Sequence, residues 1–237
     1  MKNKFVVLSD IHFPYQDDKA LKAVYKFLEQ HSVDTIILNG DILDFYDVSS
    51  FDKDPDRVNS LQKEIDMATK FFKKLRIIKP EVRIVFIKGN HEYRLERYLK
   101  KHPELYSLDA LKLPNLLDLK KYNIEYSDKG IRLGNLKIIH GDMVRKFSGY
   151  TARGELEKHD SSGICGHVHR LSCYYYRTPE RYLAWYESGC LCDLNPEYIN
   201  EPNWQQAFLY GYIEKDSFAV TPIPIVDGKI KCVLLED

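Results

Sequence analysis

Residues 83 to 92 read Arg83-Ile-Val-Phe-Ile-Lys-Gly-Asn-His-Glu92 and hold the clearest structural signal in the chain. The apolar run Ile84 to Ile87 is typical of a short strand that is buried on both faces. It stops at Gly89, which can adopt the positive φ of a tight turn, and three polar residues follow at once. In open α/β sheets, ligands bind beyond the carboxyl ends of the strands. The stretch therefore predicts a strand that carries an amide, an imidazole and a carboxylate into a binding crevice.

Four more strand-like runs end in the same way. Phe5 to Ser9 precedes Asp10-Ile-His12, Thr35 to Asn39 precedes Gly40-Asp41, Leu136 to Ile139 precedes His140-Gly-Asp142, and Ser162 to Cys165 precedes Gly166-His-Val-His169. A single run of this kind would be an ordinary polar turn. Five runs that all end in His, Asp or Asn predict one shared metal site.

The ordered set resembles the calcineurin-like metallophosphoesterases, and within them the phosphodiesterase and nuclease branch. The residues that carry the resemblance are Asp10-x-His12, Gly40-Asp41, Gly89-Asn90-His91-Glu92, His140 and Gly166-His167-x-His169. The resemblance implies an α/β fold of two face-to-face mixed β-sheets flanked by helices. It also implies hydrolysis of phosphoesters by water or hydroxide that two metal ions activate.

Two residues apart on an extended segment point the same way, so Asp10 and His12 can hold one ion together. Ions roughly 3.5 to 4 Å apart need a bridging carboxylate, and Asp41 is the natural bridge. By resemblance, Asp10, His12 and His169 complete one site, and Asn90, His140 and His167 complete the other. Carboxylate and imidazole ligands suit several ions. We expect two divalent ions, manganese first, with zinc, iron(II) or nickel as alternatives.

His91 is predicted to be catalytic and not to bind metal. Beside a phosphoryl group it could protonate the leaving oxygen or stabilise developing charge, and the alternative is a satisfied core histidine. In the resembling phosphatases a carboxylate at the position of Asp44 orients this histidine. Glu92 is expected to cap the following helix.

Composition sets the remaining limits. The 237 residues suit one domain, residues 1–237, with a strand-rich part from about residue 174. The 35 basic and 35 acidic residues cancel, so no global basic footprint predicts a protein that coats nucleic acid. The five cysteines (165, 173, 190, 192 and 232) are expected to be reduced and mostly buried. With no signal segment or membrane span near the N-terminus, we expect a soluble, cytoplasmic protein.

The pattern between the motifs predicts the remaining elements. Helices are expected after a cap at Asp17 or Asp18, over Leu61 to Leu75, over Glu92 to Lys101 and over Gly149 to His159, with short helical turns in Leu105 to Leu119. A hairpin is expected over Ile131 to Ile139, and later strands over Tyr174–Arg177, Tyr182–Glu187, Ala207–Ile213, Phe218–Thr221 and Lys229–Leu234. The aromatic and acidic residues 42 to 57 are expected to form a loop over the mouth of the site.

The substrate is harder to predict. Protein phosphatases of the superfamily carry Gly-Asp-x-Val-Asp-Arg-Gly, and Phe45 stands here in place of that arginine. The Gly-His-x-His ending is instead similar to the diesterase branch. Candidate substrate-binding residues are Arg94, Arg97, Arg145, Lys146, Tyr150 and Arg153, although such runs are usually solvated faces. Phe45, Tyr46, Tyr150 and Trp204 are candidates for stacking on bases.

The sequence thus predicts a two-metal hydrolase of phosphodiesters of nucleotide or nucleic-acid type. The acidic residues of 44 to 56 would repel a long polyanion, which favours a small substrate or the end of a single strand. One alternative is a phosphomonoesterase that acts on small molecules or phosphoproteins. A third class is a binding scaffold that kept the fold without catalysis.

Overall fold

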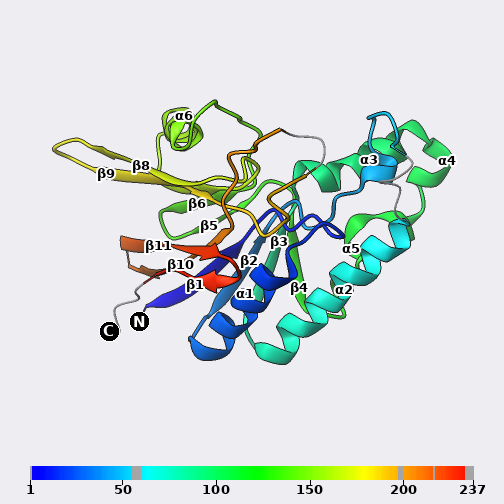
Figure 1. Ribbon diagram of the computed structural model, residues 1–237, viewed down its shortest axis with the longest axis horizontal. Coiled ribbons are helices and arrows are strands. Elements are labelled where there is room, and N and C mark those ends of the chain that lie inside the picture. Colours follow the sequence, from blue (N-terminus) through cyan, green and yellow to red (C-terminus); the bar gives the residue numbers. More distant parts are fainter. Residues whose placement is uncertain (1, 55–59, 197–199, 216, 233–237) are drawn as a thin grey trace.

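The computed structural model describes residues 2–54, 60–196, 200–215 and 217–232. Two β-sheets face each other, and helices cover their outer faces (Figure 1). This is the α/β fold of two mixed sheets that the sequence predicts.

Within the described residues the larger sheet has seven strands, in the order β12-β11-β10-β1-β2-β3-β4. Their bounds are β1 Asn3–Leu8, β2 Thr35–Asn39, β3 Arg83–Ile87, β4 Ile124–Ser127, β10 Ala207–Glu214, β11 Ser217–Val226 and β12 Lys229–Ile230. Strands β1 to β4 are parallel to one another, and β10 joins β1 in antiparallel pairing. The carboxyl ends of β1, β2 and β3 therefore lie at the same edge.

The smaller sheet has five strands in the described part of the chain, in the order β5-β6-β7-β9-β8. Their bounds are β5 Ile131–Leu133, β6 Leu136–Ile139, β7 Gly163–Cys165, β8 Leu171–Arg177 and β9 Tyr182–Ser188. Strands β6 and β7 are parallel. Their carboxyl ends, where the later histidine motifs begin, meet the loops of the larger sheet.

The alternation of side chains along β1 shows how the layers are held together. Phe5 and Val7 pack between the sheets with Val85 of β3 and Ile164 of β7. Val6, by contrast, belongs to the core on the opposite face of the larger sheet. A strand with apolar residues on both faces is what a doubly covered sheet requires.

The helices are α1 Asp18–Gln30, α2 Leu61–Ile78, α3 Asn90–Lys101, α4 Pro103–Tyr106, α5 Leu113–Leu116 and α6 Tyr150–His159, with short 3₁₀ turns η1 Tyr46–Val48 and η3 Asp109–Leu111. Helices α1 and α2 lie on the outer face of the larger sheet, and α6 covers the smaller one (Figure 1). Asp17 caps α1 by accepting from the backbone N–H groups of Lys19 and Ala20, both at 2.8 Å. None of the described helices is long and apolar enough to cross a bilayer.

Several elements differ from the expectation. Helix α3 begins at Asn90, two residues before the predicted start, because Gly89 serves as its N-cap. Strand β4 was not predicted, and the predicted strand Lys229–Leu234 is reduced to Lys229–Ile230, with residues 233 and 234 outside the described part. The hairpin, the short turns after α3 and the later strands are confirmed, with ends that shift by a few residues.

The loop after β2 also corrects the sequence analysis. Its first part does not lie over the site mouth, because Ile42, Leu43 and Phe45 are fully buried in the core. Tyr46 is only 6% exposed, and its hydroxyl donates to the carbonyl of Asp52. Phe45 and Tyr46 therefore cannot offer their rings to a base, and that prediction is wrong.

The cysteines match the expectation. Within the described residues none of the five forms a disulfide; Cys165, Cys190 and Cys192 are buried, and Cys173 and Cys232 are partly buried.

Candidate metal centre

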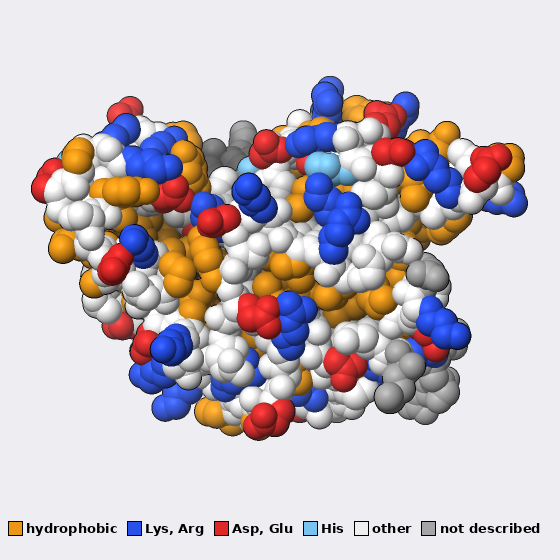
Figure 2. Space-filling model, turned by 180° about the vertical axis from the view of Figure 1, so that it is seen from behind, with side chains coloured by type: hydrophobic (Ala, Val, Ile, Leu, Met, Phe, Trp, Pro, Cys, Tyr) orange, Lys and Arg blue, Asp and Glu red, His pale blue; other side chains and the backbone are white. Residues whose placement is uncertain are grey.

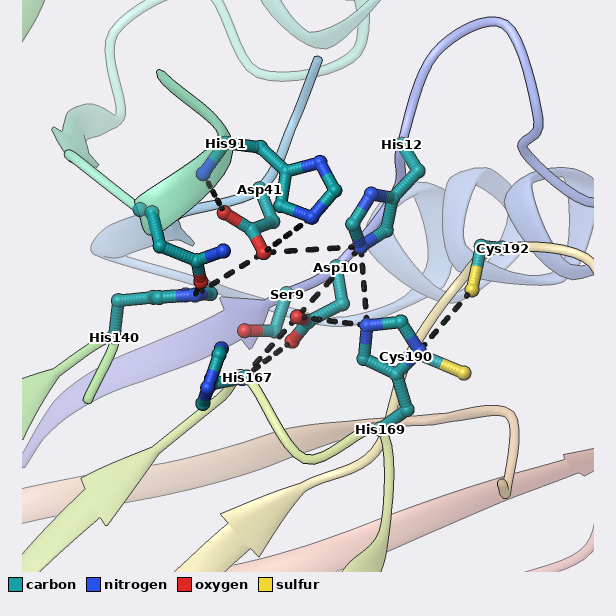
Figure 3. A network of polar contacts seen from close by, with 12 residues as sticks. Ser9, Asp10, His12, Asp41, His91, His140, His167, His169, Cys190 and Cys192 are labelled. Atoms are coloured by element: carbon teal, nitrogen blue, oxygen red, sulfur yellow. Dashed lines mark hydrogen bonds and ion pairs between the residues drawn. The ribbon is translucent and has the colours of Figure 1, made fainter. Parts of the chain in front are cut away.

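The predicted ligands meet where the two sheets end. The loop after β1 carries Asp10 and His12, and the loop after β2 carries Asp41. Their side chains face the residues that follow β6 and β7 (Figure 3). Histidine side chains reach the surface at the upper edge of the molecule in Figure 2, with Lys and Arg side chains close beside them.

One group of ligand atoms consists of Asp10, His12 and His169. His169 Nε2 lies 3.2 Å from Asp10 Oδ1 and 3.0 Å from His12 Nε2. All three side chains are buried. Two imidazole nitrogens that face each other beside a carboxylate are arranged as the ligands of one cation.

A second group consists of Asp41, His140 and His167. His140 Nε2 lies 3.2 Å from Asp41 Oδ2 and 3.0 Å from Asn90 Oδ1. The ring of His167 stands 5.4 Å from the ring of His140, centroid to centroid. The amide oxygen of Asn90 thus joins this second group, as the resemblance implies.

Asp41 lies between the two groups. Its Oδ2 is 3.2 Å from His140 Nε2 in the second group and 3.8 Å from His12 Nε2 in the first. A carboxylate in this position can contact both ions of a two-metal site. The role of Asp41 as the bridging residue stays a prediction, which this position supports.

The second ring nitrogen of His12, His140 and His169 is held by a partner outside the centre. His12 Nδ1 lies 3.2 Å from Asp44 Oδ1, and His140 Nδ1 donates to the carbonyl of Asn39 at 2.8 Å. His169 Nδ1 faces the Cys192 thiol, at 3.8 Å. These partners leave Nε2 of each ring directed at the centre, which is how outer partners orient metal-binding histidines.

Burial and charge act against each other here. Burial raises the pKa of Asp41, but His140 and His91 lower that pKa well below its usual value. Burial lowers the pKa of His140, whereas the charge of Asp41 raises it to about 10. Burial also lowers the pKa of His169, and Cys192 and Asp10 raise it to about 10. A ligating imidazole must be neutral, so binding of cations would displace these protons.

Five of the seven predicted ligands have left-handed backbone. The φ angles are 55° at Asp10, 55° at His12, 51° at Asp41, 69° at His167 and 56° at His169. Such conformations are uncommon outside glycine, and Asp and His are among the residues that adopt them most often. They turn each chain sharply at the end of its strand, so that the side chain projects into the centre.

Glu92 supports the bridging residue from behind. Its buried carboxylate accepts four backbone N–H bonds, from Gly89 at 2.8 Å, Asp41 at 2.9 Å, Ile42 at 2.8 Å and Leu43 at 3.1 Å. It therefore caps α3, as expected, and also fixes the loop that presents Asp41. A side chain at position 89 would collide with the carboxylate of Asp41, so Gly89 is needed for this close approach.

His91 lies beside the centre, outside the two groups described above, and its ring forms a third possible ligand group with His12 and Asp44. Its backbone N–H donates to Asp41 Oδ1 at 2.9 Å, and its Nδ1 lies 3.0 Å from Asp44 Oδ1. Nε2 is 3.7 Å from Asp41 Oδ2. Burial lowers the pKa of His91, but Asp41 and Asp44 raise it overall. The contact with Asp44 is the one expected of an orienting carboxylate.

Arg94 makes two contacts beside the centre that the sequence did not predict. Its Nη1 donates to the carbonyl of Asp44 at 2.8 Å, and its Nη2 donates to His91 Nε2 at 2.9 Å. From the sequence alone, Arg94 was one of six candidate substrate-binding residues. The signal that could have found it is the spacing of three residues from His91 on a helix, which puts both side chains on one face.

The other candidate substrate-binding residues lie farther from the predicted metal ligands. Arg97 donates to Ser50 Oγ at 3.0 Å, and Arg153 pairs with Glu157 on α6, so neither contacts a predicted ligand in the structure. Arg145, Lys146 and Tyr150 are exposed around the loop that precedes α6. Trp204, from the segment before β10, packs against His169 with ring centroids 4.2 Å apart.

The donor set suits the ions that were predicted. Carboxylate oxygens, an amide oxygen and imidazole nitrogens match manganese, zinc or iron(II). Residues from five strand ends, gathered into two groups around the carboxylate of Asp41, form a candidate dinuclear metal centre on a two-sheet fold. Such a centre is suited to transfer of a phosphoryl group to water.

A comparison with known families agrees with this class. The model of the calcineurin-like phosphoesterase family matches residues 3–189. The chain belongs to that family, and this membership supports a metal-dependent hydrolase of phosphoesters.

Two phage proteins are similar to the chain over nearly their whole length. The Gene 54 protein of Mycobacterium phage D29 is 28% identical, over 97% of this chain and 96% of the phage protein. The Gene 54 protein of Mycobacterium phage L5 is 25% identical over the same shares. Their names state no activity.

The solved structures that resemble the chain include Vacuolar Protein Sorting 29 from Cryptosporidium parvum. It has a TM-score of 0.51 and 13% identity, and the match covers 97% of this chain and 95% of that one. Wild-type Vps29 from Entamoeba histolytica, solved with Zn²⁺, has a TM-score of 0.50 and 16% identity, with 97% of each chain covered. At these identities the similarity supports the fold alone.

Proposed function

We propose that this protein hydrolyses phosphodiesters of nucleotide or nucleic-acid type at a two-metal centre. The observation that carries the proposal is the position of Asp41 Oδ2, 3.2 Å from His140 Nε2 and 3.8 Å from His12 Nε2. A binding scaffold would not need a carboxylate shared by two groups of ligands. Nor would it need a histidine and an arginine in contact beside them.

In the proposed reaction the chain's own residues would hold the ions, bind the phosphoryl group and supply a proton to the leaving oxygen. When bound, two divalent ions would polarise the phosphoryl oxygens and lower the pKa of the attacking water. We propose manganese, with zinc, iron(II) or nickel as alternatives. His91 stands next to Asp41, and its protonated ring would donate to the leaving oxygen once Nε2 no longer accepts from Arg94. Asp44 orients that ring.

Two observations favour diesters. His167 and His169 of the Gly-His-x-His ending both reach the centre, and the arginine of the protein-phosphatase motif is replaced by the fully buried Phe45. The exposed Arg145 and Lys146, in the segment between His140 and α6, could hold neighbouring phosphates of a single-stranded or end-bound nucleic acid. We also propose that the protein acts in the cytoplasm.

One observation favours a phosphomonoesterase as the second candidate. The guanidinium of Arg94 contacts both the carbonyl of Asp44 and the ring of His91. Arg94 of α3 thus brings a guanidinium next to Asp44 and His91, where the protein-phosphatase arginine is replaced by Phe45. A fixed guanidinium suits the roughly two negative charges of a phosphomonoester near neutral pH.

A comparison of bis-p-nitrophenyl phosphate with p-nitrophenyl phosphate tests the choice. We expect a higher kcat/KM on the diester, with manganese or zinc added. Arg94→Gln should then lower activity on the monoester more than on the diester, and Arg97→Gln, one turn along α3, serves as the matched control. A strong preference for the monoester would favour the second candidate. Metal binding without hydrolysis of either compound would favour a scaffold.

A further inference from the structure

Trp204 is an aromatic side chain at the edge of the metal centre. It is one of two tryptophans in the chain and is half-buried. Its ring meets the ring of His169 edge to face. The other tryptophan, Trp185, is fully buried and stacks against His159 of α6. Only Trp204 of the two could therefore contact a bound substrate.

The segment that carries Trp204 is fixed to the loop of His169. The backbone N–H of Gln205 donates to the carbonyl of His169 at 2.9 Å, and Leu171 donates to Gln205 Oε1 at 3.1 Å. The backbone N–H of Cys190 donates to the carbonyl of Gln205 at 3.0 Å. These bonds hold the indole in one place relative to the ligands, as a stacking surface requires.

Trp204 also lines a cavity of about 380 Å³. That volume is within the range of roughly 300 to 1,000 Å³ that small-molecule sites occupy. Besides Trp204 and Gln205, its wall includes Asp17, Lys19, Asp193 and Asp227. Asp17 Oδ1 caps α1 and Asp193 Oδ1 accepts from the backbone N–H of Asn195, but three negative charges against one lysine still disfavour a phosphate inside the cavity. They favour a neutral group that donates hydrogen bonds.

We propose that this cavity binds the base of a nucleotide substrate, stacked on Trp204, with an exocyclic amino group directed at the carboxylates. This inference rests on the proposed function and narrows its substrate to nucleotides that carry such a base. Tryptophan faces stack on any base, and Asp accepts from the amino group of cytosine. Because the indole ring meets the ring of His169, the phosphoryl group of the same nucleotide would lie toward the metal ligands.

Fluorescence tests binding at the cavity without catalysis. In a Trp185→Phe background, Trp204 is the sole tryptophan. Cytidine 5′-monophosphate should change its emission at lower concentration than uridine 5′-monophosphate, because uracil presents a carbonyl where cytosine presents the amino group. Ribose 5-phosphate should leave the emission unchanged. An equal response to ribose 5-phosphate, or no response to either nucleotide, would overturn the proposal.

Kinetics in the unmodified background test the same idea independently of Trp185. Trp204→Leu should raise KM for the p-nitrophenyl ester of cytidine 5′-phosphate roughly 5- to 100-fold, the effect of losing one stacked base. Trp204→Phe should restore most of the loss, and KM for bis-p-nitrophenyl phosphate, which has no base, should rise by a smaller factor than KM for the cytidine ester. Asp193→Asn should narrow the difference between cytidine and uridine substrates.

The outcomes separate this inference from the proposed function. If the unmodified protein fails to hydrolyse bis-p-nitrophenyl phosphate, the proposed function is wrong, and the fluorescence titration still decides whether the cavity binds a base. If the diester is hydrolysed but Trp204→Leu leaves KM for the cytidine ester unchanged, the base site alone is wrong.

Discussion

Replacement of Glu92 by glutamine tests how the bridging residue is held. One carboxylate oxygen accepts from Ile42 and Leu43, and the other accepts from Gly89 and Asp41. Glutamine keeps one oxygen, and its NH₂ group would face two N–H donors. Two bonds to a charged acceptor are lost, at about 1.5 to 3 kcal/mol each.

Part of that loss is recovered. Burial raises the pKa of Glu92, as does the charge of Asp41, so removing the carboxylate's charge relieves an unfavourable interaction. We therefore expect Glu92→Gln to lower the free energy of unfolding by about 2 to 4 kcal/mol. Urea denaturation in the presence of a chelator measures it without a contribution from bound metal.

Glu96 provides the matched control on the same helix. It pairs with Lys88 and Lys100 near the surface, so Glu96→Gln should cost no more than about 1 kcal/mol. If Glu92→Gln and Glu96→Gln have the same stability, the four backbone bonds do not hold the loop, and this account of how Asp41 is positioned is wrong.

Four further predictions follow from the centre and its surroundings. Asp41→Asn should lose metal from both sites and abolish turnover while the circular dichroism spectrum stays unchanged, and near-normal activity with manganese would refute the bridge. His91→Asn should keep full metal content by elemental analysis and lose roughly 10²- to 10⁴-fold in kcat, whereas loss of one metal equivalent would make His91 a ligand. Burial raises the pKa of Glu64 to about 8 in the folded protein. At pH values between the pKa of Glu64 in the unfolded chain and about 8, the folded state therefore binds one proton more than the unfolded state. Stability should fall by up to about 1.4 kcal/mol per pH unit over that window, and Glu64→Gln should flatten the slope in urea denaturation. Neutralising Arg145 and Lys146 together should raise KM for an oligonucleotide but not for bis-p-nitrophenyl phosphate, and the effect should shrink as salt rises; equal losses on both would place these residues in the chemistry or the fold.

The core of the site could be predicted because it depends on local pattern. Each strand is a short apolar run, and the carboxyl ends of parallel strands meet at one edge. Asp10 and Asp41 follow two strands that are neighbours in the larger sheet. His140 and His167 follow two parallel neighbours in the smaller one. Once the runs were recognised, the meeting of their last residues required no knowledge of the loops.

The contacts around that core could not be predicted in the same way. Phe45 has the sequence context of a loop over the site, yet its left-handed backbone turns the ring into the core. The approach of Arg94 to the carbonyl of Asp44 depends on how α3 packs beside the loop after β2. Trp204 lies 35 positions beyond His169, in a segment without a motif. Strand β4 is short and half polar, so periodicity alone does not distinguish it from a loop.

The left-handed backbone at five predicted metal ligands links the packing of the sheets to the geometry of the site. Each such residue costs roughly 1 to 3 kcal/mol, so the strain at Asp10, His12, Asp41, His167 and His169 is several kcal/mol in total. The strands that precede these turns are buried on both faces, and a strand cannot slip by one residue without exchanging its two faces. The packing of Phe5 and Val7 between the sheets therefore fixes where β1 ends, and with it the turn at Asp10. The core that the sheets share therefore holds the predicted ligands in strained conformations, and the packing of the strands sets the geometry of the centre.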